Sequence, residues 1–244
     1  MHPFPLDGGL SRADAHNLPP LSVGARGGTD GPPLLKTGTT TMAIACPDGV
    51  VMATEKRATM GLLVGHKNTQ KMFPVDAHLA LTTAGLVGDA QMIARHLQAQ
   101  AQLYRFKRDA PMPVRGAATL LGNILNQSRY SPYWVQLIVG GIDHKGGSIY
   151  SVDSAGGAIQ DPWTVTGSGS AFAYGVLEDR IEPTTPVKEA VDLAIRALNA
   201  AMRRDAASGN GMDVAIIDQQ GFRRLEEADI LKRHKALKLP LSWT

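Results

Sequence analysis

Apolar and polar residues alternate with two distinct periodicities along most of this chain of 244 residues. Alternation at every second position, or a short continuous apolar run, predicts β-strands, because successive side chains of a strand point to opposite faces of a sheet. Strands are therefore expected over residues 40–46, 50–55, 69–73, 78–83, 134–142, 148–153, 158–161, 212–217 and 222–225. Apolar residues at three- and four-residue spacing predict helices over residues 90–106, 113–129, 172–179 and 186–204.

The order of these elements indicates the fold class. Strand blocks alternate with pairs of helices, in the order strands, two helices, strands, two helices, strands. This order favours two antiparallel sheets stacked between helical layers, because each sheet then buries both of its faces. We therefore expect an α+β fold, a four-layer αββα sandwich, in which no second domain is needed.

Residues 1–38 differ in composition from the rest of the chain. Glycine and proline make up 13 of these 38 residues but only 28 of the other 206. Because these residues interrupt the segment every few positions, it has no room for a helix or a paired strand. Composition leaves two interpretations open, a disordered tail and a leader that is removed.

Charge and cysteine content exclude several classes of protein. The net charge of +3 is small, and the one basic cluster, residues 232–235, is interpreted as a solvated helix face rather than a nucleic-acid surface. The single cysteine, Cys46, rules out an internal disulfide and a cysteine-ligated zinc site, suits a reducing compartment, and is expected to be a small buried hydrophobe. No apolar stretch reaches about 18 residues and no secretory pattern begins the chain, so a cytoplasmic protein without a membrane segment is expected.

The motifs of nucleotide-binding proteins and ordinary hydrolases are missing from the sequence. Gly167-Ser168-Gly169-Ser170 precedes a predicted helix, but it lacks the lysine and the glycine spacing of a phosphate loop, so a tight turn is expected. The seven histidines show no metal-ligand spacing, and His66 and His78 are interpreted as surface or core residues. No Gly-x-Ser-x-Gly segment occurs. Neither serine, cysteine nor metal hydrolase chemistry is expected, and no cofactor.

The border between the loose segment and the first strand has the sequence Gly38-Thr39-Thr40-Thr41. It is either the plain start of a strand or a cut site that frees a threonine as a nucleophile. An N-terminal threonine carries its own base, an α-amine with an ordinary pKa of about 7.7–8.0. A nearby cation lowers that pKa and helps to stabilise an oxyanion, so this chemistry needs a buried lysine and a carboxylate to hold it. The candidates are Glu55, Lys56 and Arg57, which the end of the second strand returns to the neighbourhood of Thr39, and Lys71, in an otherwise uncharged segment; each could also be a plain surface residue.

Seven segments, taken together in their order and spacing, resemble proteasome β-subunits of the archaeal type, and the resemblance extends from residue 39 to about residue 231. They are GTTT (38–41), VMATEKR (51–57), HKN (66–68), TAGLVGDAQ (83–91), VGGID (139–143), TGSGS (166–170) and RDAASG (204–209). The resemblance implies the N-terminal-nucleophile hydrolase fold, an αββα sandwich, which agrees with the order of the predicted elements.

Position by position, the resemblance implies a threonine-type endopeptidase. It places autocleavage between Gly38 and Thr39, and makes Thr39 the nucleophile, with its freed amine as the proton acceptor. Lys71 matches the lysine that tunes this amine, and Glu55 matches the carboxylate that pairs with the lysine. The N–H of Gly85 matches the oxyanion donor. Residues 1–38 are then a propeptide, and residues 39–244 are the mature peptidase domain.

The remaining matched positions surround the nucleophile and the substrate. Three polar residues match the group that orients the nucleophile and its water, and each also has a plain interpretation in a turn or helix cap: Ser168, Asp205 and Ser208. The main chains of Thr59 and Gly85 match positions that pair with an extended substrate, which suits broad specificity. The primary specificity pocket is matched by small, largely apolar residues: Ala58, Thr83 and Val87. Cleavage after hydrophobic residues is therefore expected.

The resemblance also implies an assembly. β-Subunits of this family form seven-membered rings, and two such rings stack between two rings of α-subunits around a closed chamber. ATP-dependent unfolding complexes open the chamber to unfolded polypeptides, and the helices between residues 89 and 129 are expected to supply ring and neighbour contacts. The leader is longer than those usual in the archaeal type, so its role stays open, and Lys56 stands where arginine is common.

Two other interpretations of the sequence compete with a catalytic β-subunit of the archaeal type. A catalytically silent ring subunit has no reason to keep Gly38-Thr39, Glu55 and Lys71 together. A bacterial hexameric relative, or a small-molecule amidase of the N-terminal-nucleophile class, is a further alternative. The two long helices and the Ser–Gly-rich segments near residues 168 and 208 favour the heptameric archaeal-type form.

Overall fold

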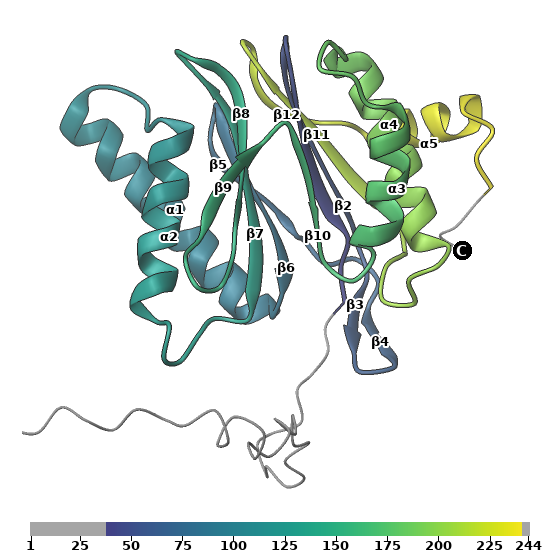
Figure 1. The fold of residues 1–244 in the computed structure, drawn as a ribbon, viewed down its shortest axis with the longest axis horizontal. Coiled ribbons are helices and arrows are strands. Elements are labelled where there is room, and N and C mark those ends of the chain that lie inside the picture. Colours follow the sequence, from purple (N-terminus) through teal and green to yellow (C-terminus); the bar gives the residue numbers. More distant parts are fainter. Residues whose placement is uncertain (1–37, 241–244) are drawn as a thin grey trace, which may run out of the picture. The chain divides into compact units, whose positions relative to one another are not determined.

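The computed structural model describes residues 38–240, and the predicted leader lies outside this range except for Gly38. Two five-stranded antiparallel sheets form the middle of the fold (Figure 1). The first sheet has the order β10 (Trp163–Thr166), β1 (Thr41–Cys46), β2 (Gly49–Glu55), β11 (Met212–Asp218) and β12 (Gly221–Arg224). The second has the order β5 (Met72–Asp76), β6 (Leu79–Gly85), β7 (Val135–Asp143), β8 (Gly146–Val152) and β9 (Ala158–Asp161). A separate hairpin consists of β3 (Ala58–Met60) and β4 (Leu63–His66).

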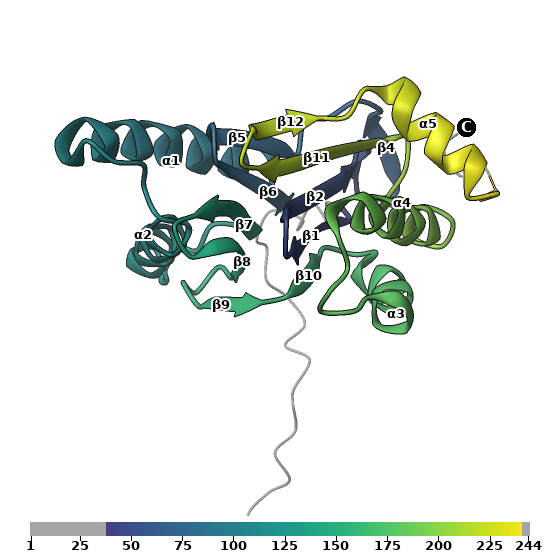
Figure 2. The ribbon, with the colours of Figure 1, turned by 90° about the horizontal axis from the view of Figure 1, so that it is seen from above.

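Helices cover the outer face of each sheet (Figure 2). The second sheet carries α1 (Val87–Arg108) and α2 (Val114–Gln127). The first sheet carries α3 (Ser170–Arg180) and α4 (Val187–Met202), and α5 (Glu227–Ala236) packs beside α4. The layers are therefore helix, sheet, sheet and helix, which confirms the predicted αββα sandwich and the α+β class.

Alanine, methionine and β-branched side chains fill the space between the two sheets. Ala43 and Ala215 of the first sheet face Ala80 of the second, and the buried side chains of Met52 and Met72 fill the gaps that these alanines leave. Methionine suits such irregular spaces because its side chain is unbranched and flexible. This inner layer holds the two sheets face to face, and so fixes how the ends of their strands meet.

In the outer layers, apolar residues at the predicted three- and four-residue spacing pack one face of each helix against a sheet. On α4 the buried alanines, among them Ala190, Ala194 and Ala197, let the helix approach the first sheet closely. On the other side Leu97 of α1 and Leu121 of α2 are fully buried against the second sheet. Full burial of a leucine side chain stabilises a fold by about 1.5–3 kcal/mol, so these stripes account for the helices being held against the sheets.

Every predicted helix and strand is present, with ends that differ by a few residues. Two of the additional strands, β3 and β4, were not predicted because they are only three and four residues long and expose Leu63 and Val64. The four-residue edge strand β10 was also missed. Short strands with exposed apolar residues carry no clear two-residue alternation.

The structure shows the surroundings of Cys46 and of the basic cluster at residues 232–235. Cys46 is buried, as expected, and burial raises the pKa of its thiol to about 12, with the carboxylate of Asp48 adding to the effect. The basic cluster at residues 232–235 lies on a helix, α5, but its interpretation as a solvated face is wrong at one position. His234 is 1% exposed, and its Nε2 lies 3.2 Å from Oδ1 of Asn199 on α4, because α5 packs this face against α4.

A close contact at Gly122 allows the packing of α2 to be tested. A Cβ added at Gly122 would lie 2.7 Å from the main-chain oxygen of Gly156. Alanine favours a helix over glycine by about 1 kcal/mol, but overpacking against backbone costs about 1–3 kcal/mol, so the clash should outweigh the propensity. We expect Gly122→Ala to lower the Tm by about 2–4 °C in differential scanning calorimetry.

Gly116→Ala is the matched control in the same helix. Its added Cβ would meet Met112 and Pro113 only at 3.6 Å, which is ordinary van der Waals contact. The Tm of this variant should stay the same or rise. A Gly122→Ala protein as stable as the Gly116→Ala protein would show that α2 adapts freely and that the contact does not constrain it.

Candidate active site

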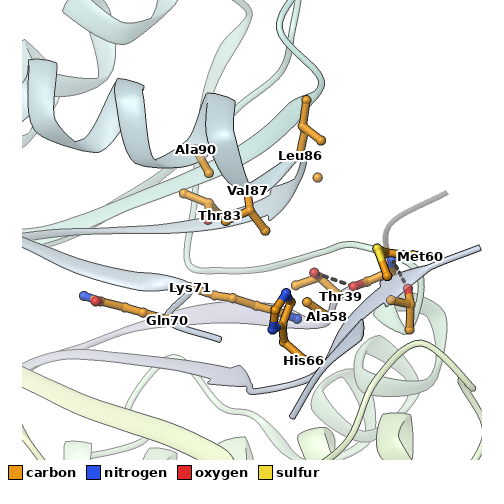
Figure 3. Close-up of a pocket in the computed structure, with 13 residues that line it drawn as sticks. Thr39, Ala58, Met60, His66, Gln70, Lys71, Thr83, Leu86, Val87 and Ala90 are labelled. Carbon is orange, nitrogen blue, oxygen red and sulfur yellow. Dashed lines mark hydrogen bonds between the residues drawn. The ribbon is translucent and has the colours of Figure 1, made fainter. Parts of the chain in front are cut away.

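A cleft of about 220 Å³ opens where the start of β1 meets the end of β6 (Figure 3). The residues that line it come from the segment before β1, the β3–β4 hairpin, the segment before β5, the end of β6 and the start of α1: Gly38, Thr39, Ala58, Thr59, Met60, His66, Gln70, Lys71, Thr83, Gly85, Leu86, Val87 and Ala90. All of the predicted substrate-binding residues are in this set: Ala58, Thr59, Thr83, Gly85 and Val87. Figure 3 shows Lys71 extending toward Thr39 along one wall, with Thr83, Leu86, Val87 and Ala90 on the other.

Thr39 lies two residues before the start of β1 and is held by the turn that follows β10. The N–H of Thr39 donates to Oγ of Ser168 at 3.1 Å. The Thr39 carbonyl accepts a hydrogen bond from the Gly169 N–H at 3.4 Å, and its oxygen lies 3.3 Å from the same Ser168 Oγ. A Cβ at Gly167, where φ is +96°, would lie 2.0 Å from that carbonyl oxygen. Glycine is therefore required at position 167 both for its backbone conformation and for this close approach.

Ser168, Asp205 and Ser208, the three residues predicted to orient the nucleophile, form one hydrogen-bonded group, the serine network. Oδ2 of Asp205 accepts hydrogen bonds from the hydroxyls of Ser168, at 2.6 Å, and Ser208, at 2.7 Å. The Ser208 hydroxyl also lies 2.7 Å from the hydroxyl of Thr40. The turn role expected of Asp205 is present as well, since its Oδ1 accepts from the Ala207 N–H at 3.1 Å. Helix α3 begins without a side-chain cap, so Ser168 does not serve as one.

Lys71 and Glu55 form a buried ion pair between the two sheets. The Lys71 ammonium donates to Oε1 of Glu55 and to the carbonyl of Arg57, and the side chains of Lys71 and Glu55 are 6% and 0% exposed. Burial lowers the pKa of Lys71 and raises that of Glu55, while the attraction within the pair opposes both shifts. The N–H groups of Thr40, Arg57 and Gly209 also donate to the Glu55 carboxylate.

Gly85 ends β6 on the wall of the cleft that faces Thr39. Its φ is +115°, and a Cβ there would lie 2.0 Å from the carbonyl oxygen of Trp134. Only glycine fits both constraints. Gly85 itself lines the cleft, so a substrate carbonyl could reach its main chain there.

The bond that precedes Thr39 is closely packed in the uncut chain. The Thr39 hydroxyl donates to the carbonyl oxygen of Gly38 at 2.7 Å, and the Gly38 N–H donates to the Thr59 hydroxyl at 3.1 Å. A Cβ on Gly38 would lie 1.8 Å from Cβ of Ala207 and 2.8 Å from Oγ of Ser168. Glycine at position 38 therefore allows the Gly38–Thr39 peptide to lie against the serine network with the hydroxyl beside its carbonyl.

These contacts define what the site can do chemically. A buried threonine hydroxyl lies in a cleft whose lining includes a lysine held by a carboxylate, and a three-residue hydroxyl and carboxylate network holds the threonine main chain. If the bond before Thr39 is cut, the new amine stays beside Ser168. A threonine hydroxyl with its own amine nearby is an activated nucleophile of the acyl-transfer type.

The structure adds cleft residues that the sequence did not predict. They are Met60, His66, Gln70, Leu86 and Ala90. The interpretation of His66 as a surface or core residue is incomplete, because the exposed ring of His66 lines the cleft. His78, by contrast, is a satisfied, partly buried residue whose Nε2 lies 2.8 Å from the Met112 carbonyl. The placement of His66 depends on the short β3–β4 hairpin, which gave no signal in the sequence.

Residues 38–240 contain neither a candidate metal site nor a membrane-spanning helix. No cluster of three or more histidine, cysteine, aspartate or glutamate side chains in this range is arranged to hold a metal ion. No helix within the same range has the length and apolar character needed to cross a membrane.

Comparison with known proteins gives one consistent family. The model of the proteasome subunit family matches residues 35–217. A protein named proteasome subunit beta from Methanothermobacter thermautotrophicus is 52% identical over 197 residues, which are 80% of this chain and 94% of the relative. Proteins of the same name from Picrophilus torridus and Thermoplasma acidophilum are 48% and 49% identical, over 85% of this chain and 99% and 98% of their own lengths.

Proposed function

Because the chain belongs to the proteasome subunit family, we propose that it is a β-subunit of the proteasome core and a threonine-type endopeptidase. The observation that carries this proposal is the position of Thr39, whose buried hydroxyl faces a cleft beside the Lys71–Glu55 ion pair and the serine network of Ser168. Unfolded polypeptides are the proposed substrates.

The first reaction is self-cleavage after Gly38. Oγ of Thr39 attacks the Gly38 carbonyl carbon, a C–O bond forms, and the C–N bond to Thr39 breaks as its nitrogen takes up a proton. The product is an ester between Gly38 and the Thr39 hydroxyl, and water hydrolyses it to a Gly38 carboxylate and a free hydroxyl. The 2.7 Å contact between this hydroxyl and the Gly38 carbonyl oxygen supports the reaction, because the reacting groups are already adjacent. Residues 1–38 are then the propeptide, and residues 39–244 the mature peptidase.

The second reaction repeats this chemistry on a substrate. The freed amine of Thr39 takes the hydroxyl proton, directly or through water, while Oγ attacks the substrate carbonyl. The N–H of Gly85 is proposed to stabilise the oxyanion, and a single such donor can be worth about 10²–10³ in rate. The amine side of the substrate leaves with a proton, and water then hydrolyses the ester left on Thr39.

The surrounding residues set the charge and orientation of the nucleophile. The Lys71 ammonium lowers the pKa of the Thr39 amine by electrostatic repulsion of its protonated form, and Glu55 keeps Lys71 in place. The three residues of the serine network, Ser168, Asp205 and Ser208, hold the main chain of Thr39 and orient the attacking water.

Cleavage after hydrophobic residues is proposed from the lining of the cleft. Ala58, Thr83 and Val87 present small, largely apolar groups, and the neighbouring Leu86 and Ala90 extend this surface. The main chains of Thr59 and Gly85 are proposed to pair with an extended substrate as an added strand, which recognises backbone rather than side chains.

The proposed assembly follows the family. The chain is placed in a core with α-subunits, in a seven-membered β-ring that stacks on a second β-ring, with ATP-dependent unfolding complexes supplying substrate. Helices α1 and α2 are proposed to contribute ring and neighbour contacts. The cytoplasm is the proposed compartment, which the reduced, buried Cys46 suits.

One experiment tests these proposals together. The full chain is co-expressed with an α-subunit of the same organism, and assembled particles are analysed by intact mass and with a panel of reporter peptides. We expect a β-chain that begins at Thr39. Peptides with leucine or phenylalanine before the reporter should be cleaved about tenfold faster than those with aspartate or lysine, because a desolvated charge in the apolar cleft is costly.

The outcomes separate the parts of the proposal. A β-chain that retains residues 1–38 in active particles would exclude the N-terminal threonine mechanism. Correct processing with a preference for charged residues would leave the mechanism intact and overturn the specificity.

A further inference from the structure

The two halves of the candidate site belong to different sheets. Thr39 precedes β1, which lies between β10 and β2 in the first sheet, whereas Gly85 ends β6, which lies between β7 and β5 in the second. The distance between the nucleophile and the proposed oxyanion donor therefore depends on how the two sheets are held together at this edge.

One flank of this edge is joined by the ion pair already described. Glu55 is the last residue of β2, and Lys71 directly precedes β5. The pair thus joins the strand next to β1 to the strand next to β6. It fixes one side of the cleft.

The other flank is joined by the side chain of Gln136. Its Oε1 accepts a hydrogen bond from the N–H of Gly167 at 3.2 Å. Gln136 is the second residue of β7, where it pairs with Ala84, the neighbour of Gly85. Gly167 directly follows β10 and directly precedes Ser168. Gln136 therefore joins the strand beside the oxyanion donor to the turn that holds the nucleophile.

The turn at Gly167 is coupled to Thr39 by close packing and by a hydrogen bond. The Gly167 Cα packs against the Thr39 carbonyl so closely that a Cβ would lie 2.0 Å from its oxygen, and the next residue, Ser168, accepts from the Thr39 N–H. Release of the Gly167 N–H from Gln136 would let this turn shift, and Thr39 would shift with it. A displacement of about 1 Å at a reacting centre can cost about 10²-fold in rate.

We propose that Gln136 is a positioning residue that fixes the nucleophile of the first sheet relative to the oxyanion donor of the second. The inference rests on the proposed peptidase function. Gln136 does not line the cleft, so it acts through Gly167 and Ser168 rather than on the substrate. Its exposed position within the otherwise buried run of β7 agrees with a role outside the core.

The test compares variants that remove or keep the acceptor. Gln136→Met has nearly the length of glutamine without an acceptor oxygen, and Gln136→Glu keeps the acceptor. We expect kcat to fall about tenfold in Gln136→Met particles with KM within about twofold, because substrate contacts are retained, whereas Gln136→Glu keeps kcat within about threefold of the wild type.

Gln98→Met is the matched control. It removes the hydrogen bond that the Gln98 side chain, on α1, donates to the carbonyl of Pro74 on β5, away from the cleft, and should leave kcat unchanged. Peptide hydrolysis is measured on assembled, mass-verified particles. If Gln136→Met does not assemble, Gln136→Asn, which is one methylene too short to reach Gly167, must show the loss of kcat instead.

Two results would overturn the inference. One is a kcat within twofold of the wild type when the acceptor is removed or shortened. The other is an equal loss in Gln136→Glu. Failure of the proposed function looks different, because the wild-type particle itself would then show no peptide hydrolysis that depends on Thr39.

Discussion

Replacing Thr39 with alanine should leave residues 1–38 attached to the chain and reduce peptide hydrolysis by at least about 10⁴-fold. Removal of a covalent nucleophile takes away the acyl-transfer route for both reactions, so only uncatalysed attack by water on bound substrate is left. The fold should persist, because the Thr39 main chain, not its hydroxyl, makes the bonds to Ser168 and Gly169. Intact mass reports the first effect, and hydrolysis of a reporter peptide the second.

Two matched variants distinguish the loss of the Thr39 hydroxyl from a general effect of substituting any threonine at the start of the first strand. Thr39→Ser keeps a hydroxyl at the same atom position, so it should still be processed and should keep measurable hydrolysis. Thr41→Ala removes a buried hydroxyl two residues away that donates to the Ala53 carbonyl at 3.3 Å. It should cost about 1 kcal/mol of stability but leave processing and activity in place.

Some outcomes would remove Thr39 from its proposed role. Hydrolysis by Thr39→Ala particles at a rate near the wild type would show that another group is the nucleophile. Loss of activity in Thr41→Ala particles of normal mass would show that the assay reports damage to the first strand rather than chemistry at Thr39.

The sequence could predict those contacts of the site that form between residues close together in the chain. The first hairpin was predicted from alternation, and a hairpin brings its ends together, so Glu55 was expected near Thr39. The structure confirms this, because the Thr40 N–H donates to Oε1 of Glu55. Lys71, sixteen residues later, was a candidate because its segment is otherwise uncharged, but its partner was assigned only by resemblance to the family.

The remainder of the site depends on contacts between distant segments. Ser168 reaches Thr39 across 129 residues because β10 pairs with β1, with Thr166 opposite Thr41. Strand β10 is only four residues long, so it has no alternation long enough to predict a strand. The sequence alone also does not indicate which strand β10 pairs with. His66 and Gln136 were missed for the same reason. Their roles arise from the stacking of elements whose local patterns say nothing about their partners.

Lys71→Met should be the second severe change, and it combines two effects. Loss of the ammonium leaves the buried Glu55 carboxylate unpaired, which costs about 3–5 kcal/mol of stability. Peptide hydrolysis should fall by about 10²–10⁴-fold: protonation of the freed Thr39 amine, which then keeps a higher pKa, accounts for about tenfold at neutral pH, and loss of a cation that helps to stabilise the oxyanion accounts for the remainder. Any residual activity should accordingly rise with pH over a range higher than that of the wild type.

The double variant Glu55→Gln with Lys71→Met separates the structural effect from the chemical one. It removes both charges from the buried site, so part of the lost stability should return, because no buried charge is then unpaired, although the glutamine NH₂ group cannot accept the backbone hydrogen bonds that one carboxylate oxygen of Glu55 accepts. The activity should not return, because the cation is still missing beside Thr39. Thermal unfolding and peptide hydrolysis of the same particles measure the two effects independently.

Lys56→Met provides the reference for a lysine at the same end of β2. Its ammonium lies 3.6 Å from Asp213 and 4.0 Å from Glu227, and its side chain is 17% exposed, so the charge is partly solvated, unlike that of Lys71; its loss should cost about 1 kcal/mol and leave hydrolysis unchanged. If the double variant recovers both stability and activity, Lys71 only neutralises Glu55 and takes no part in the chemistry. If it recovers stability alone, the buried ammonium acts on Thr39 itself, and the ion pair holds that charge where the nucleophile needs it.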